Sequence, residues 1–284
     1  MERVEAPVTR QVAPEIVIRP EGGLLNLDLA GIWQYRELLY FLAWRDIKVR
    51  YKQTVLGVAW VVLQPVLTML IFSVIFGRLA GLPSEGVPYP LFTFAALVPW
   101  QLFSYALTQS STSLVADQNL ITKVYFPRLV IPTASVMAGV LDFVISFMIL
   151  LGMILIYGIP LTWRLLVLPF LVLLTLATAI SVGLWLSALN VKYRDVRYTL
   201  SFLTLFWMYA TPIAYSSTLI PPGWRLLYSL NPMVGVVEGF RWALLDTSTW
   251  VGPMVFVSAG VVLLLLISGL IYFRRMEDSF ADVI

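Results

Sequence analysis

Long uncharged stretches, separated by short polar ones, dominate the pattern of hydrophobic and polar positions along this chain. A helix that crosses a bilayer needs about 20 mostly apolar residues, and several stretches approach or exceed that length. The pattern therefore predicts an all-α, polytopic membrane protein with six transmembrane helices. The predicted spans are residues 54–76, 89–116, 129–159, 165–189, 198–215 and 251–273.

Three of the predicted spans are irregular. The first is interrupted by Gln64-Pro65, the third contains Asp142, and the fifth is short and aromatic with Pro212 near its end. Asp142 is the only acidic residue inside a predicted span. An ionisable group within a membrane is costly and usually faces protein or water. Asp142 therefore either lines a conduit or is a structural hydrogen-bond partner for a neighbouring helix.

The composition agrees with a membrane protein and excludes several kinds of enzyme. Only 12% of residues are charged, whereas soluble domains carry about 25%. Cysteine and histidine are absent, which removes thiolate nucleophiles, histidine-based triads and the usual zinc sites. No G-x-x-x-x-G-K-[ST] phosphate loop occurs. We therefore predict that the chain is not an enzyme and holds no metal or cofactor of its own.

The positions of the basic residues predict the orientation. If the amino terminus is cytoplasmic, the outer loops contain only Arg78, Arg164, Arg225 and Arg241 of the 19 lysines and arginines. Because lysine and arginine concentrate in cytoplasmic loops, this is the favoured arrangement. We expect a multi-pass protein of the inner or plasma membrane with both termini in the cytoplasm.

Two segments precede the first span. Residues 1–30 are polar and rich in proline, which predicts a flexible cytoplasmic tail unlike a signal peptide. Residues 31–53 have helical periodicity and predict an amphipathic helix along the membrane interface, or alternatively a cytosolic extension of the first span. Its polar stripe consists of Gln34, Glu37, Arg45, Lys48 and Lys52.

The basic residues of this helix are candidates for substrate uptake. Topology alone accounts for most cytoplasmic basic residues, but these could also bind the phosphates of a lipid-linked substrate or anionic lipid headgroups. The candidates are Arg45, Lys48, Arg50 and Lys52.

Residues 216–250 form an outer segment that a single helix cannot cross, because Pro221-Pro222-Gly223 and Asn231-Pro232 interrupt it. We expect two short helices that enter the outer leaflet and return. Irregular backbone at membrane depth requires shielding by protein or an aqueous path, so the segment is a candidate outer gate. The gate candidates are Pro212, Tyr215, Pro221, Trp224, Asn231 and Pro232.

The cytoplasmic loop 117–128 predicts a short helix that Asp117 caps and Pro127 ends. Exposed apolar residues in a short loop favour docking to a soluble partner, although an ordinary helical hairpin is the alternative. The coupling candidates are Asp117, Asn119, Leu120, Ile121, Lys123, Tyr125, Phe126 and Arg128.

Five stretches, in order along the chain, resemble the permease subunits of ABC-type polysaccharide exporters, which move O-antigen, capsule or teichoic-acid chains. The resemblance extends from about residue 31 to the carboxyl terminus. The stretches are RDIKVRYKQTVLGVAW (45–60), KVYFPR (123–128), NVKYRDV (190–196), TPIAY (211–215) and NP (231–232).

The resemblance implies a homodimer with two copies of a separate ATPase that binds ATP and Mg²⁺. It implies that the substrate is a lipid-linked glycan. The other expected partners are membrane lipids, and no nucleic acid is expected to bind. The glycan would pass along a channel between protomers, lined by the first and fifth spans. Aromatic rings in the fifth span would then be a sliding surface for sugars, whereas simple packing is the alternative. The lining candidates are Trp60, Phe72, Phe202, Phe206, Trp207, Tyr209 and Asp142.

Two other functions compete with polysaccharide export. A permease of the same fold could export drugs or small lipids, but should show less aromatic enrichment in the fifth span. A membrane-embedded glycan-processing enzyme is disfavoured because the chain lacks histidine and acidic clusters.

Overall fold

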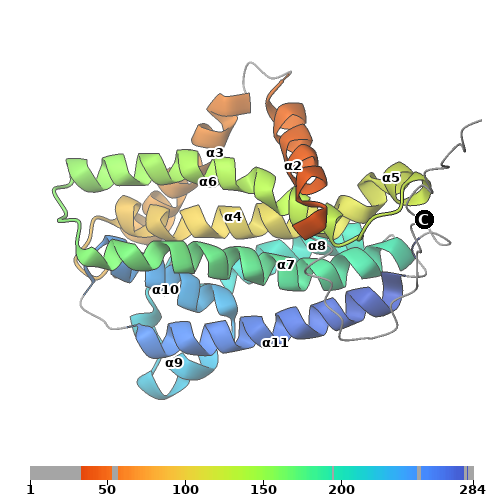
Figure 1. Ribbon diagram of the computed structural model, residues 1–284. Coiled ribbons are helices and arrows are strands. Elements are labelled where there is room, and N and C mark those ends of the chain that lie inside the picture. Colours follow the sequence, from red (N-terminus) through yellow and green to blue (C-terminus); the bar gives the residue numbers. More distant parts are fainter. Residues whose placement is uncertain (1–32, 53–56, 194, 248–250, 278–279, 281–284) are drawn as a thin grey trace, which may run out of the picture.

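Four long helices run side by side and form the body of the protein (Figure 1). The structure is a computed structural model that describes residues 33–52, 57–193, 195–247, 251–277 and 280. These residues are helical without any strand, which confirms the all-α prediction for the part of the chain described. The tail 1–30 lies outside the described residues. The four helices are α4 (Tyr89–Ala116), α6 (Val130–Ile156), α7 (Leu168–Lys192) and α11 (Gly252–Glu277).

Helix α4 is the centre of this body. It packs against α6 and α7, and α7 packs in turn against α11. Within the described residues, five helical segments are long and apolar enough to cross a membrane. Among these five, α4 is the most buried inside the protein, so its neighbours rather than lipid surround most of it. The five segments are Ala59–Leu79, Tyr89–Ala116, Val130–Ile156, Trp163–Lys192 and Gly252–Glu277.

The first span is a continuous helix, and the predicted interruption at Gln64-Pro65 is wrong. Helix α3 (Gly57–Phe72) runs through Pro65 and continues as the π-helix η1 (Ser73–Leu79). Proline is tolerated inside membrane helices because neighbouring groups can satisfy the backbone carbonyl that it leaves without a donor. The change of helical register therefore falls after Phe72 instead.

Helix α2 (Arg36–Tyr51) lies across the four long helices rather than beside them (Figure 1). It packs mainly on α6, where Leu42 and Ala43 are buried. Its exposed side carries large aromatic residues, including Tyr40, Phe41 and Trp44, as well as charged ones. Aromatic and basic side chains together are typical of helices at a membrane interface.

Helix α8 (Val196–Tyr209) is shorter than the predicted fifth span, 198–215. Its 14 residues extend about 21 Å, which is less than the roughly 30 Å of a hydrocarbon core. Helices α7 and α11 run in the same direction (Figure 1), so α8 and the segment after it must return the chain to the end where α11 begins. The return is completed by non-helical residues after Ala210 and by the outer segment.

The outer segment folds as two short helices, as its prolines predicted. These are α9 (Pro222–Tyr228) and α10 (Pro232–Leu244), preceded by the 3-10 turn η3 (Ser217–Leu219). Asn231 caps α10, because its side chain accepts a hydrogen bond from the backbone N–H of Met233 at 3.1 Å. Helix α10 is buried along its whole length and packs against α4, α7 and α11.

Arg241 of α10 holds the outer segment together, although the orientation argument placed it in an outer loop. Its side chain is 1% exposed. The guanidinium donates to the backbone oxygens of Phe92 at 3.3 Å, Tyr215 at 3.3 Å and Ile213 at 2.8 Å. It also pairs with the buried Glu238 at 3.1 Å. One side chain thus satisfies carbonyls from α4 and from the irregular stretch after α8, which has no helical donors of its own.

We predict that Arg241→Met destabilises the protein by roughly 3–5 kcal/mol, because it leaves the buried Glu238 without its cation and the carbonyls of Ile213 and Tyr215 without the donor that Arg241 supplies. Thermal unfolding of the detergent-purified chain, followed by intrinsic tryptophan fluorescence, measures this. Arg78→Met is the matched control, since Arg78 is exposed. Equal melting temperatures for the two variants would contradict the role assigned to Arg241.

Candidate functional site

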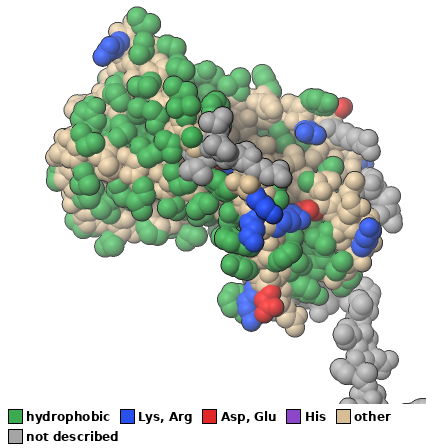
Figure 2. Space-filling view, turned by 90° about the horizontal axis from the view of Figure 1, so that it is seen from above, with side chains coloured by type: hydrophobic (Ala, Val, Ile, Leu, Met, Phe, Trp, Pro, Cys, Tyr) green, Lys and Arg blue, Asp and Glu red, His purple; other side chains and the backbone are tan. Residues whose placement is uncertain are grey.

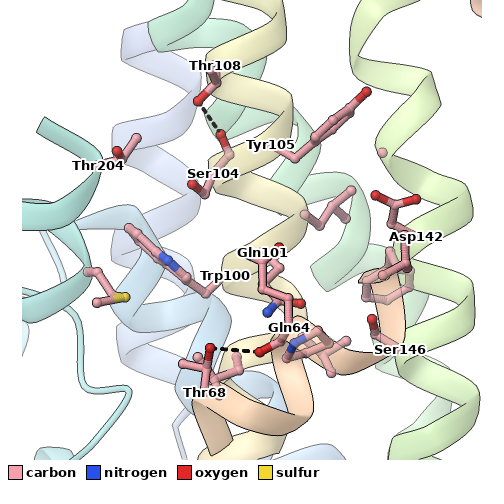
Figure 3. A pocket seen from close by; sticks show the side chains of 18 of the residues that line it. Gln64, Thr68, Trp100, Gln101, Ser104, Tyr105, Thr108, Asp142, Ser146 and Thr204 are labelled. Atoms are coloured by element: carbon pink, nitrogen blue, oxygen red, sulfur yellow. Dashed lines mark hydrogen bonds between the residues drawn. The ribbon is translucent and has the colours of Figure 1, made fainter. Parts of the chain in front are cut away.

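A cavity of about 560 Å³ lies between α3, α4, α6 and α8. In Figure 3, α4 stands in the middle, α8 with Thr204 lies to its left and α6 with Asp142 to its right. Helix α3 contributes Gln64 and Thr68 at the bottom of the view. Its polar wall residues include Gln64, Thr68, Gln101, Ser104, Tyr105, Thr108, Gln109, Asp142, Ser146, Ser201 and Thr204.

The wall is rich in neutral hydrogen-bonding groups. Gln101, Ser104 and Thr108 follow one another along α4, and Thr204 of α8 lies on the opposite side (Figure 3). The hydroxyl of Thr108 donates to the backbone oxygen of Ser104 at 2.8 Å, so its lone pairs remain available as acceptors. The cavity therefore offers amides that donate and accept, together with hydroxyls.

Pro65, inside the continuous helix α3, adds to this polar character. Proline has no N–H, so the backbone oxygen of Val61 lacks its usual helical donor. Both Val61 and Pro65 line the cavity. The proline therefore places an additional acceptor beside the cavity without ending the helix.

Asp142 closes one end of the cavity through an ion pair. Its carboxylate pairs with Arg50 of α2 and accepts a hydrogen bond from the hydroxyl of Tyr51. The guanidinium of Arg50 also lies over the ring of Tyr105, 4.3 Å from its centroid. Asp142 is thus a partner for a neighbouring helix and also a residue of the cavity wall, and its role in a conduit stays a prediction.

Gly139 makes room for this cluster. A Cβ atom at position 139 would lie 2.4 Å from Cδ1 of Tyr105, closer than real contacts allow. The glycine lets the Tyr105 ring pack directly on α6, where it supports Arg50.

A second ion pair connects α2 to the end of α4. Arg45 donates to both carboxylate oxygens of Asp117, at 2.8 and 2.7 Å, and also contacts Asp46 at 2.9 Å. The hydrogen bond with Asp117 raises the pKa of Arg45 above its usual range, while burial raises the pKa of Asp46. A two-pronged guanidinium–carboxylate contact fixes orientation as well as distance. Asp117 immediately precedes α5 (Gln118–Lys123), so α2 is linked to the cytoplasmic loop.

The comparisons with known proteins agree with this architecture. A family model described as ABC-2 type transporter matches residues 37–245, from α2 to the end of α10. That range covers well over half of the chain. The chain belongs to the ABC-2 type transporter family.

Its relatives include named polysaccharide transport proteins. The chain is 31% identical to the O-antigen export system permease protein RfbA of Myxococcus xanthus, over 89% of this chain and 97% of that protein. It is 28% identical to the RfbA permease of Klebsiella pneumoniae, over 87% and 95% of the two chains. It is 24% identical to the polysialic acid transport protein KpsM of Escherichia coli, over 83% and 92%.

The predicted channel residues of this ABC-2 family chain do not share one location: some line the cavity, some are exposed and some are buried. Trp60 lines the cavity and is exposed. Phe202, Phe206 and Tyr209 are exposed on α8, whereas Phe72 is buried against neighbouring helices. Trp207 packs edge-on against Phe103 and donates to Asn231 at 2.7 Å, so it joins α8 to the outer segment.

The predicted gate residues fall into an inner and an outer group. Pro212 is buried, and the Tyr215 hydroxyl contacts that of Tyr228 at 2.8 Å. Asn231 donates to the backbone oxygen of Ala210 at 3.1 Å and caps α10. Pro232 is buried at the start of α10, while Pro221 and Trp224 are exposed at the start of α9.

The loop 117–128 is only partly exposed, so the prediction that its apolar residues are exposed is wrong for two of them. Ile121 and Phe126 are buried in the protein itself, so they anchor the loop. Asp117 stands at the start of α5, but its side chain makes no capping hydrogen bond because Arg45 binds it. Arg128 is bound to the end of α11, where its backbone N–H donates to Glu277 at 3.1 Å.

The remaining coupling candidates lie on the outside of this loop. Asn119 and Lys123 are exposed, and Leu120 is half-buried. Tyr125 is 74% exposed, next to the buried Phe126. The four consecutive residues 122–125 are exposed between the buried Ile121 and Phe126, so the loop has one exposed stretch between two anchored positions.

Most of the polar cavity wall could not be recognised from the sequence. Gln101, Ser104 and Thr108 lie in a helix that is otherwise apolar, at intervals of three and four residues. That spacing places them on one face of a helix. The periodicity was the available signal, but it cannot show whether the face meets lipid, protein or a cavity.

We predict that Asp142 and Arg50 stabilise the protein as a pair. Asp142→Asn and Arg50→Gln should each lower the melting temperature, and the double variant should lose less than the sum of the two. The expected coupling is roughly 0.5–3 kcal/mol. A double-mutant cycle measured by thermal unfolding in detergent tests this, and strictly additive effects would show that the two side chains act independently.

Proposed function

We propose that this chain is the transmembrane permease subunit of an ATP-driven exporter, which moves a lipid-linked, O-antigen-like polysaccharide from the cytoplasmic side across the membrane. The observation that carries the proposal is the polar cavity between α3, α4, α6 and α8. Family membership and the polysaccharide-transport names of the relatives support the same conclusion.

The lining of the cavity suits sugars better than apolar cargo. Sugars carry many hydroxyls that both donate and accept, and amides and hydroxyls such as those of Gln101 and Ser104 can exchange hydrogen bonds with them. Trp60 and Trp100 contribute ring faces to the same wall. A permease for drugs or small lipids would be expected to have a mostly apolar pocket with only a few polar groups.

The proposed transport path requires a second copy of the chain. Helices α3 and α8 both line the cavity, and α8 also carries the exposed rings Phe202, Phe206 and Tyr209. Two copies that face each other across these helices would enclose a channel in which neutral polar groups and aromatic rings alternate. Weak contacts of this kind allow a polymer to slide without being held.

The membrane arrangement follows from the same elements. We place the outer segment outside and the cytoplasmic loop inside, with six crossings and both termini in the cytoplasm. Figure 2 shows hydrophobic side chains over most of one face, with charged side chains gathered mainly toward one end. In this arrangement α8 and the irregular stretch after it make the fifth crossing, and α9 and α10 form the outer gate.

Energy for transport would come from two copies of a separate ATPase that binds ATP and Mg²⁺. The exposed face of the 117–128 loop is the proposed docking site. Arg45 and Asp117 then link this loop to α2, and Arg50 and Asp142 link α2 to the cavity wall. A movement of the loop would therefore move α2 through the Arg45–Asp117 ion pair, and α2 would move the cavity wall through the Arg50–Asp142 ion pair.

We predict that Ser104→Trp abolishes most polysaccharide export, because an indole would fill the cavity. Thr112→Trp, two turns further along α4 and outside the cavity wall, is the matched control and should retain export. Cell-surface glycan in a strain that depends on this permease, normalised to permease content of the membrane, measures the effect. Equal export by both variants would exclude the cavity as the path.

We predict that Tyr125→Ala weakens association with the ATPase at least several-fold while leaving thermal stability near that of the native chain. Phe126→Ala is the matched comparison and should lower stability, because it removes a buried ring. Co-purification of the ATPase and thermal unfolding are measured on both variants. Normal ATPase association of Tyr125→Ala would contradict docking at this face.

A further inference from the structure

A groove of about 620 Å³ runs between α2 and α6, distinct from the polar cavity. Its floor is apolar and consists of Ile47 and Tyr51 of α2 with Leu141 and Ile145 of α6. Trp44, Lys48 and Lys52 form its rim on α2 at intervals of four residues, so they share one side of that helix.

The groove and the cavity lie on opposite sides of a common wall. Asp142 of α6 lines the cavity, whereas its neighbours Leu141 and Ile145 line the groove. On α2, Arg50 lines the cavity and Tyr51 lines the groove. The contacts of Asp142 with Arg50 and with the Tyr51 hydroxyl close the wall between the two spaces.

Two different roles follow for the four basic residues in the second half of α2 and at its C-cap, Arg45, Lys48, Arg50 and Lys52. Arg45 and Arg50 are each bound by a carboxylate of another helix, Asp117 and Asp142 respectively. No ion pair to Lys48 or Lys52 occurs within the described residues, and both side chains are exposed. The ammonium of Lys48 lies 5.4 Å from the centroid of the Trp44 ring, beside the groove.

We propose that this groove binds an anionic membrane phospholipid. An acyl chain lies on Leu141 and Ile145, and the lipid phosphate is bound by Lys48 and Lys52 at the rim. Trp44 then sits at headgroup level, where amphipathic rings concentrate. The site goes beyond the transport function, and its occupancy needs neither glycan nor ATPase.

Charge and shape both favour this occupant. Two lysines near a membrane surface attract anionic lipid headgroups over neutral ones. The floor offers apolar area but few polar groups, which suits a hydrocarbon chain and not a sugar. A lipid held here would fix α2, the helix that joins the cytoplasmic loop to the cavity wall.

The test uses the full chain, purified from a host that makes no lipid-linked glycan. The chain is reconstituted with equal amounts of phosphatidylglycerol and phosphatidylcholine, and the lipids that remain bound are counted by native mass spectrometry. The native chain should retain phosphatidylglycerol in preference. Lys48→Gln/Lys52→Gln should reduce that preference by roughly tenfold or more, and Lys192→Gln, a change at an exposed lysine at the end of α7, should not.

A second variant separates the groove from the lysines. Leu141→Trp fills the groove and leaves Lys48 and Lys52 in place, so it should lower retention of both lipids. No preference in the native chain, or an unchanged preference in the double lysine variant, would overturn the proposal. Displacement of phosphatidylglycerol by an added polyprenyl diphosphate in the native chain but not in Leu141→Trp would also overturn it, because the groove would then belong to the transported lipid.

Discussion

The outer half of this protein depends on the guanidinium of Arg241. The chain leaves helical geometry after α8, and irregular backbone inside a membrane protein must find donors for its carbonyls. Arg241 donates to Ile213 and Tyr215 in that stretch and to Phe92 of α4, while Glu238 balances its charge. A buried cation is tolerated because every direction of the guanidinium meets an oxygen or, at Phe92, a ring face. The short crossing and the folded outer segment can therefore coexist.

Ion pairs serve a related purpose at the other end of the molecule. Helix α2 lies across the long helices, where Leu42 packs in a buried apolar cluster and two ion pairs add to its attachment. Arg45 holds it to Asp117 at the start of the cytoplasmic loop, and Arg50 holds it to Asp142 beside the cavity. Because both arginines lie on one helix, movement of the loop and the shape of the cavity wall are mechanically connected. The side chains of Lys48 and Lys52 remain exposed, and the proposed phospholipid site rests on that exposure.

Aromatic content alone was an incomplete guide to the residues that line the cavity. The exposed rings Phe202, Phe206 and Tyr209 of α8 are not among the residues that line the cavity, whereas amides and hydroxyls from four helices line it together with apolar side chains. Such residues are individually unremarkable in a membrane helix, since serine and threonine commonly bond to their own backbone. They can act together on a polysaccharide only because the fold places them around the same cavity, where each can exchange hydrogen bonds with sugar hydroxyls.

The sequence by itself determined the all-helical class, most of the span positions, the two-helix outer segment and the family resemblance. Each depends on local properties: the length of apolar runs, prolines that stop helices, and short motifs in fixed order. Tertiary structure decided the partners of the charged residues. The sequence predicted Arg241 in an outer loop, but its side chain is buried. It predicted Arg128 as a docking residue, but Arg128 binds the end of α11. It predicted Phe126 as exposed, but the ring is buried. The burial and the partners of a charged or aromatic side chain depend on its neighbours in the folded protein. Those neighbours come from distant parts of the sequence, so local patterns cannot identify them.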